Sequence, residues 1–243
     1  MNDVLIVIPA RYGSSRLPGK MLKTIAGKPV IQHVYEACKK ANVGEVFIAT
    51  ESQIVVDAVA KFGATAILTS ENCQSGTDRI FEVAKNRTEP FIINVQGDEP
   101  MIPPEIIDRL AGAFAEEPDL KMATMVTRME ESEYGDPSAV KVVTDKNGYA
   151  LFFSRSLIPY PRNRTELFKV YKHVGIYAYT RTFLMQYAAM APTPLEQVES
   201  LEQLRVLENG YKIKVLESDF RGIGVDTQED LDAVNKLFAE KEA

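Results

Sequence analysis

The stretch that decides the fold is Val4-Leu5-Ile6-Val7-Ile8, which ends at Pro9. A short unbroken apolar run is typical of a strand buried on both faces, as in a parallel sheet. Similar runs recur at residues 46–49, 66–68 and 91–95, and amphipathic helical patterns separate them. Strand and helix therefore alternate four times in about a hundred residues, which predicts right-handed βαβ units on a parallel sheet.

The second half of the sequence is more mixed. Strands are expected at residues 122–127, 139–143, 149–153, 174–179 and 213–216, with a strand-like run at 223–225. Asn147-Gly148 is a strong hairpin signal between the second and third of these. Helices are expected at 195–207 and near 231–238. The pattern predicts an α/β fold: a Rossmann-like, mostly parallel sheet with flanking helices, plus a smaller inserted mixed β region that forms a second sheet.

Composition narrows the class of protein. Lys and Arg number 28 against 34 Asp and Glu, so the net charge is −6. This charge argues against a general nucleic-acid binder but permits a local basic pocket for one anionic ligand. The two cysteines are too few for a disulfide scaffold and are expected to be reduced thiols. No apolar run reaches the ~18 residues of a membrane span, and the N-terminus does not resemble a signal peptide. We expect a cytoplasmic protein without membrane insertion.

The loop after the first strand has the composition of a phosphate site. It lies where open α/β sheets bind ligands. Glycines permit close backbone approach, hydroxyls can donate, and three cations fall within ten residues. These residues are Gly13, Gly19, Ser14, Ser15, Arg11, Arg16 and Lys20. Neither the Walker A pattern nor the dinucleotide G-x-G-x-x-G pattern is present. A merely solvated basic loop is the alternative interpretation.

Two distant aspartates are candidate metal ligands. Asp98 ends the fourth strand, beside the first strand's loop, and Asp226 follows residues 223–225. Mg²⁺ usually takes one or two carboxylates together with substrate phosphates and water. The alternatives are a turn role for Asp98 before Pro100 and an N-cap role for Asp226. Glu99 would point away from Asp98 in extended backbone, and His33 suits a hydrogen-bonded histidine within a helix.

Eight segments together resemble one family. They are Ile8-Pro9-Ala10-Arg11-Tyr12, Arg16-Leu17-Pro18-Gly19-Lys20, Gln74-Ser75-Gly76-Thr77-Asp78-Arg79, Asn94-Val95-Gln96-Gly97-Asp98-Glu99-Pro100, Phe153-Ser154-Arg155, His173-Val174-Gly175-Ile176-Tyr177, Leu201-Glu202-Gln203-Leu204-Arg205 and Gly224-Val225-Asp226-Thr227. The first loop resembles that of the sugar-nucleotidyltransferase superfamily. The order and spacing of the rest resemble the 3-deoxy-manno-octulosonate (Kdo) cytidylyltransferases over nearly the whole chain.

The resemblance implies specific residue roles. The catalytic residues would be Arg11, Lys20, Asp98 and Asp226, and the last two would bind Mg²⁺. Nucleotide contacts would come from Pro9, Ala10, Arg11, Gly13, Ser14, Lys20, Ser75, Gly76, Arg79 and Gln96. Sugar-acid contacts would come from Gln96, Arg155, His173, Tyr177, Glu202 and Gln203. Cys73 stands where the family often has histidine, a departure that puts base contacts at this position in doubt.

The implied reaction is CTP + Kdo → CMP-Kdo + diphosphate, for lipopolysaccharide biosynthesis. The resemblance also implies a homodimer. We expect one nucleotidyltransferase domain over residues 1–243, with 1–120 mainly nucleotide-binding and 121–220 mainly for sugar-acid binding and dimerisation. One alternative is the same chemistry on 8-amino-Kdo, a sialic acid or another sugar. Another is a non-catalytic nucleotide-binding protein. A third is a metal-dependent glycosyltransferase, which Pro100 disfavours because such enzymes usually carry Asp-x-Asp.

Overall fold

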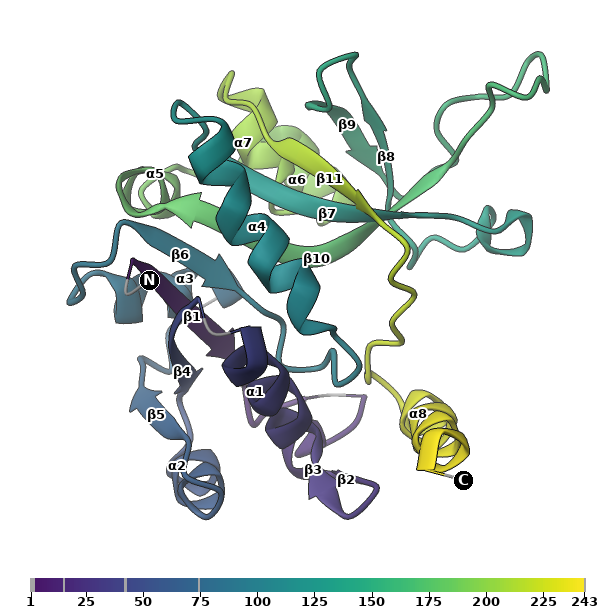
Figure 1. Ribbon diagram of the computed structural model, residues 1–243. Helices are drawn as coiled ribbons and strands as arrows, with labels where there is room; N and C mark the ends of the chain where they lie inside the picture. The colour runs from purple at the N-terminus through teal and green to yellow at the C-terminus, as the bar shows by residue number, and fades with distance from the viewer. Residues whose placement is uncertain (1–2, 15, 42, 74, 243) are drawn as a thin grey trace.

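A computed structural model describes residues 3–14, 16–41, 43–73 and 75–242. Its parallel strands are β1 (Val4–Pro9), β4 (Gly44–Thr50), β5 (Thr65–Leu68) and β6 (Phe91–Asn94), in the order β5-β4-β1-β6. All six residues of β1 are buried. Val4, Ile6 and Ile8 pack on one face, whereas Leu5 and Val7 pack on the other. The prediction of a parallel sheet that is buried on both faces is confirmed (Figure 1).

The second half extends this sheet. Strand β10 (Tyr171–Thr180) is antiparallel to both β6 and β7 (Met122–Arg128), and β11 (Lys214–Ser218) runs parallel to β7. Strands β8 (Lys141–Thr144) and β9 (Ala150–Ser154) form the expected hairpin, and β8 pairs with β10. The predicted second sheet is therefore wrong: the inserted strands join the main sheet, because β10 supplies a partner for β8. Another small sheet does form, from β2 (Thr24–Ile25) and β3 (Lys28–Pro29).

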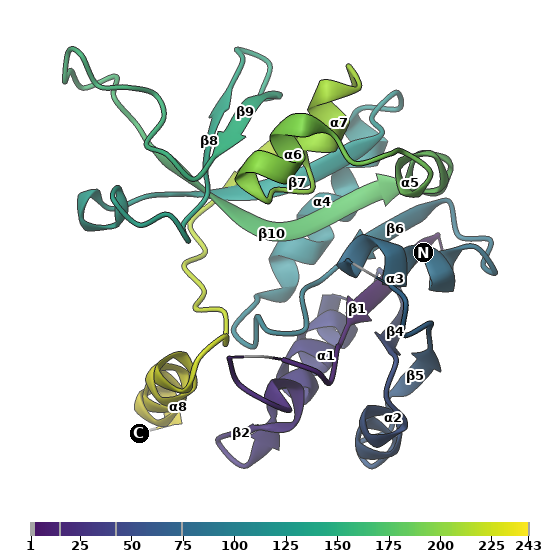
Figure 2. The ribbon, with the colours of Figure 1, turned by 180° about the vertical axis from the view of Figure 1, so that it is seen from behind.

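Helices cover both faces of the sheet. Helices α1 (Val30–Ala41), α2 (Gln53–Ala60) and α4 (Pro104–Glu116) bury apolar side chains with one face. On the opposite face lie α3 (Gly76–Ala84), α5 (Arg181–Ala188), α6 (Pro194–Glu199) and α7 (Leu204–Glu208), as Figure 2 shows from behind. Helices α4 and α5 and the 3₁₀ turns η1 (Lys20–Leu22) and η2 (Glu131–Glu133) were not predicted. Along the described chain, no helix is both long and apolar enough to cross a membrane.

The single helix expected at 195–207 is wrong. Helix α6 ends where Ser200 adopts a left-handed conformation, with φ of 51°, and α7 begins at Leu204. The carboxylate of Glu199 accepts hydrogen bonds from Ser154 Oγ at 2.6 Å and from the Arg155 backbone N–H at 3.0 Å. These bonds hold the end of α6 against β9 and the turn after it. A helix that continued past residue 199 would carry the chain away from this contact.

The C-terminal segment reaches back to the first half of the chain. Helix α8 (Gln228–Glu242) packs Leu231 and Val234 against Ile25 and Val30, beside the β2–β3 hairpin. The strand-like run at 223–225 forms no strand, so that expectation is wrong. The segment is instead fixed by one backbone hydrogen bond, from the Val225 N–H to the Asp98 carbonyl at 2.8 Å. This packing brings position 226 to the end of β6.

Candidate active site

A cavity of about 270 Å³ opens at the carboxyl ends of β1 and β6. It collects residues from four separate parts of the sequence. Its lining includes Pro9, Arg11, Gly13, Ser14, Arg16, Lys20, Met21, Cys73, Ser75, Gly76, Arg79, Gln96, Asp98 and Asp226. Every predicted catalytic and nucleotide-binding residue lies here except Ala10, which is fully buried in the core. Ser15 and Gln74, also named in the sequence analysis, lie outside the described residues.

The two predicted metal ligands converge on one point. Lys20 Nζ donates to Asp98 Oδ2 at 2.6 Å and to Asp226 Oδ1 at 2.7 Å. Arg16 donates to the other Asp226 oxygen at 2.9 Å. Burial disfavours the charged form of Lys20, but the aspartates outweigh burial and raise its pKa. For Asp226, burial is outweighed by Lys20 and Arg16, which lower its pKa. Two hard oxygen donors that meet at one cationic position fit a divalent ion such as Mg²⁺.

Thr227, not Asp226, caps the last helix. Asp230 accepts hydrogen bonds from the Asp226 and Thr227 backbone N–H groups, and its own N–H donates to Thr227 Oγ1. This is the reciprocal pattern of a capping box. The Asp226 carboxylate is therefore left for the cavity, and the N-cap alternative for this residue is wrong.

Close backbone contacts shape the basic loop that follows β1 (residues 10–20). Gly19 has φ of +65°, which glycine adopts without strain, and the Tyr12 ring lies over it. At Gly97, a Cβ atom would stand 2.8 Å from the Pro9 carbonyl oxygen, so the turn after β6 could not approach β1 with any larger residue. These glycines place the loop against the turn that carries Asp98.

A buried ion pair anchors the same loop. Arg79, 3% exposed, contacts Glu51 Oε2 at 3.0 Å. Glu51 Oε1 accepts the Tyr12 backbone N–H at 2.9 Å. Arg79 lines the cavity as predicted, but its charge is already paired with Glu51. Sequence reasoning missed Glu51, because a single acid after a strand carries no signal of its own.

Three predicted sugar-acid residues lie side by side. The His173 and Tyr177 rings have centroids 5.2 Å apart, although an irregularity in β10 between Val174 and Tyr177 interrupts the regular alternation. Gln96 lies against Gly175 within this irregularity. His173 Nε2 hydrogen-bonds to Thr124 Oγ1 at 2.9 Å, and burial lowers the pKa of His173 to about 3. The ring is therefore neutral and suited to hydrogen bonding rather than to charge pairing.

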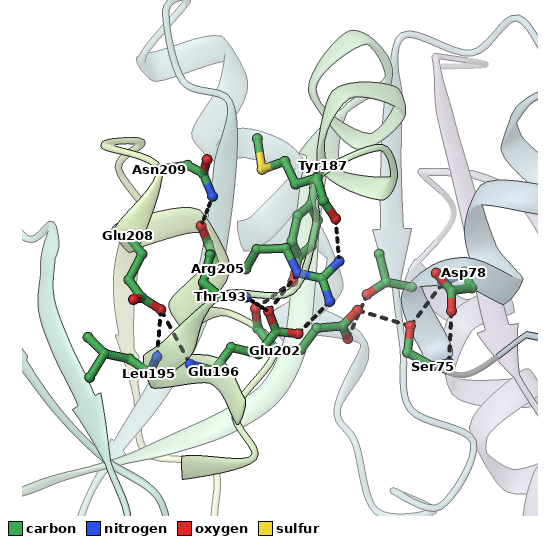
Figure 3. Close-up of polar contacts among 12 residues, drawn as sticks. Ser75, Asp78, Tyr187, Thr193, Leu195, Glu196, Glu202, Arg205, Glu208 and Asn209 are labelled. Atoms are coloured by element: carbon green, nitrogen blue, oxygen red, sulfur yellow. Dashed lines mark hydrogen bonds and ion pairs between the residues drawn. The ribbon is translucent and has the colours of Figure 1, made fainter. Parts of the chain in front are cut away.

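Glu202 joins the two predicted binding regions (Figure 3). It accepts hydrogen bonds from Ser75 Oγ at 2.9 Å and Thr77 Oγ1 at 3.0 Å, at the start of α3. Burial raises the pKa of Glu202 despite these donors. Gln203, 4% exposed, is buried at the start of α7.

Arg155 holds the turn after α6. Its guanidinium donates to the backbone carbonyls of Glu199, Pro137 and Ser200 at 2.8, 3.0 and 3.3 Å. These bonds use three of the five guanidinium N–H donors, one on each nitrogen. Arg155 therefore has a structural role, and its contact with a sugar acid stays a prediction.

Three further residues named in the sequence, His33, Arg16 and Glu99, lie outside the predicted set of site residues. His33 hydrogen-bonds to the Ile25 carbonyl at 2.8 Å, as expected for a histidine without a ligand role. Arg16, counted among the loop cations but given no role, contacts Asp226. Glu99 faces away from the first cavity, as expected, and lines a second one of about 400 Å³. Burial, chiefly, raises the pKa of Glu99 to about 7.

Comparison with known proteins identifies the class. A family model described as cytidylyltransferase matches residues 5–213. A 3-deoxy-manno-octulosonate cytidylyltransferase of Fusobacterium nucleatum is 52% identical over 96% of each chain. One of Geotalea daltonii is 50% identical over 95% of this chain and 96% of its own. The chain therefore belongs to the cytidylyltransferase family and, within it, to the 3-deoxy-manno-octulosonate cytidylyltransferases.

Solved structures agree with this assignment. A CMP:2-keto-3-deoxy-manno-octonic acid synthetase complexed with CTP has a TM-score of 0.94 and 47% identity, covering 99% of this chain and 100% of its own. A putative glucose-1-phosphate thymidylyltransferase from Bacillus anthracis has a TM-score of 0.70 at 16% identity, covering 96% and 94%. The second likeness concerns the fold alone.

Proposed function

We propose that this protein transfers a cytidylyl group from CTP to Kdo, giving CMP-Kdo and diphosphate. The observation that carries the proposal is the first cavity, where the basic loop faces Asp98 and Asp226. The relatives' names and the CTP complex of a 47% identical protein support the choice of substrates.

The reaction follows from the placement of charge. The anomeric hydroxyl of Kdo attacks the α-phosphorus of CTP, the bond from that phosphorus to the oxygen bridging to the β-phosphate breaks, and the hydroxyl proton passes to solvent as diphosphate departs. Such transfers need positioning and charge neutralisation more than covalent help from the protein. Arg11 and Lys20 are the residues we assign to the charge on the transferring and departing phosphates.

Asp98 and Asp226 would hold Mg²⁺, since their oxygens meet at one position. When bound, the ion would neutralise phosphate charge and polarise phosphoryl oxygens. Gln96, His173, Tyr177 and Glu202 would orient the sugar acid through neutral and acidic hydrogen-bonding groups beside the nucleotide cavity. Lys20 would then bind both the carboxylates and the phosphates that approach them.

We also propose a homodimer. Tyr160 and Leu167 lie between β9 and β10 with 84% and 89% of their surface exposed. Both side chains belong to one segment, and a second chain that covered this segment would remove their apolar surface from water. Charge and composition still argue against nucleic acid as a partner.

The test is diphosphate release by purified protein with Mg²⁺ and CTP, with and without Kdo. We expect release that depends on Kdo and that the Asp98→Asn variant lacks. Release with 8-amino-Kdo or a sialic acid, but not with Kdo, would keep the mechanism and overturn the acceptor. CTP binding without release for any acceptor would favour a non-catalytic nucleotide-binding protein.

A further inference from the structure

The second cavity contains an acid with no role in the proposed reaction. Glu99 directly follows Asp98, yet it lines the second cavity and not the first. Lys172, His173, Phe220 and Gly222 line the second cavity with it. Its Oε2 atom is buried and accepts no hydrogen bond from any described residue. A carboxylate in that state costs free energy, so its retention requires an explanation.

The Glu99 carboxyl group is in close contact with the segment that leads to Asp226. A Cβ atom added at Gly224 would stand 3.1 Å from Glu99 Oε1. One at Gly222 would stand 2.3 Å from the Phe220 ring and 2.8 Å from Glu99 Oε2. The segment therefore lies so close to Glu99 that an added methyl group would force the carboxyl group, the Phe220 ring or the backbone to shift.

The same segment is fixed on its other side by Asp98. The Val225 N–H donates to the Asp98 carbonyl at 2.8 Å. Residues 98 and 99 thus meet residues 222–225 twice, once through a backbone hydrogen bond and once through the Glu99 carboxyl group. Asp226 follows immediately, and its carboxylate reaches Lys20 together with that of Asp98.

We propose that Glu99 is a positioning residue, which supports the Gly222–Gly224 backbone and so sets the place of Asp226 opposite Asp98. The role is one of shape and packing: Glu99 shares the second cavity with His173 and does not line the nucleotide cavity. The inference rests on the proposed function of the two aspartates as metal ligands. Groups that hydrogen-bond to metal ligands typically change metal affinity 10–100-fold when removed, and for a support that acts by packing we expect the lower end of this range.

The test measures Mn²⁺ binding in the presence of CTP by electron paramagnetic resonance, together with kcat and KM for CTP. Gly224→Ala adds a methyl group that pushes against the Glu99 carboxyl group and displaces the segment. We therefore expect Mn²⁺ affinity to fall about tenfold, with kcat reduced more than KM is raised. Glu99→Ala removes the support and should weaken Mn²⁺ binding similarly. Gly135→Ala is the matched control, because a Cβ atom there meets nothing within 4 Å.

The double variant Glu99→Ala/Gly224→Ala separates this proposal from a general packing defect. Removing the carboxyl group makes room for the new methyl group, so its loss should be clearly smaller than the two single losses combined. Additive losses, or wild-type Mn²⁺ affinity in Gly224→Ala, would overturn the proposal.

A second comparison applies if Gly224→Ala does not fold. Glu99→Gln keeps the shape of the side chain and should bind Mn²⁺ within about threefold of wild type, whereas Glu99→Ala should not. Equal affinities for Glu99→Gln and Glu99→Ala would overturn the proposal. Because Mn²⁺ binding is read without an acceptor, a failure of Kdo turnover in the wild type is a separate outcome.

Discussion

At the scale of single residues, the proposed centre combines paired and excess positive charge. Asp98 and Asp226 are paired with Lys20 and Arg16, and Arg11 and Arg79 also line the cavity. Arg79 is paired with Glu51, which leaves the cavity with an excess of positive charge. This excess favours a polyphosphate, whose charge a divalent ion bound at the aspartates would further neutralise.

Asp98→Asn is the residue change that tests the metal assignment most directly. It removes one hard oxygen donor while keeping the size of the side chain, and Lys20 still pairs with Asp226. We expect turnover to fall by about 10²–10³ while the melting curve changes little. The measurement is diphosphate release beside a thermal melt. Near-normal turnover with a normal melt would contradict the assignment.

His173 predicts a pH dependence of stability. Its pKa is about 3 in the folded protein against an ordinary 6.5, because it is buried. The unfolded chain therefore takes up a proton first, and stability falls as the pH drops below 6.5. At pH 5 this cost is about 2 kcal/mol.

His173→Gln should remove this cost. Between pH 7 and pH 5, the unfolding free energy of the variant should fall by about 2 kcal/mol less than that of the wild type. Urea denaturation at each pH measures both changes. Parallel pH profiles for the two proteins would show that folding does not lower the pKa of His173, and would contradict the prediction.

At the scale of elements, the basic loop that follows β1 (residues 10–20) depends on a contact outside itself. The Tyr12 N–H donates to Glu51, which follows β4, and Glu51 pairs with the buried Arg79 of α3. The Glu51 carboxylate thus connects the loop, the end of β4 and helix α3. The loop's shape is set as much by this carboxylate as by its own glycines.

Glu51→Ala tests this anchoring. It leaves Arg79 buried without its ionic partner, so we expect a loss of about 3 kcal/mol in unfolding free energy, and a higher KM for CTP because the loop is released. Glu45→Ala is the control, since Glu45 pairs with Arg87 at an exposed position and should cost under ~1 kcal/mol. Equal losses in urea denaturation would contradict the prediction.

At the scale of the whole molecule, the site joins the two ends of the chain. Asp226 reaches the cavity because α8 packs on the β2–β3 hairpin and Val225 bonds to Asp98. Strand β10 lies beside β6, which brings the His173 and Tyr177 pair close to Gln96. The extended sheet thus places the two proposed substrate regions next to each other.

The proposed homodimer is also a prediction at this scale. Leu167→Asp places a charge on the exposed segment between β9 and β10, so we expect sedimentation equilibrium to show a shift from dimer toward monomer. Leu68→Asp, at the exposed edge strand β5, is the control and should leave the mass unchanged. A monomeric wild type would contradict the prediction.

The sequence by itself determined the parallel half of the sheet, the position of the basic loop and, through the resemblance to a family, most residues of the first cavity. These features depend on local patterns: unbroken apolar strands, glycines with nearby cations, and motifs at fixed spacing. The hairpin at Asn147-Gly148 was predictable for the same reason, because its turn chemistry is local.

Only the tertiary structure decided the remaining features, since each depends on partners far away in the sequence. The break at Ser200 depends on Glu199 bonding to β9 and the turn after it, and β8 and β9 join the main sheet because β10 offers an edge. Arg155 binds backbone carbonyls that only the fold brings near. The contact between Glu99 and Gly224 likewise joins residues 125 positions apart, and no pattern within either segment encodes it.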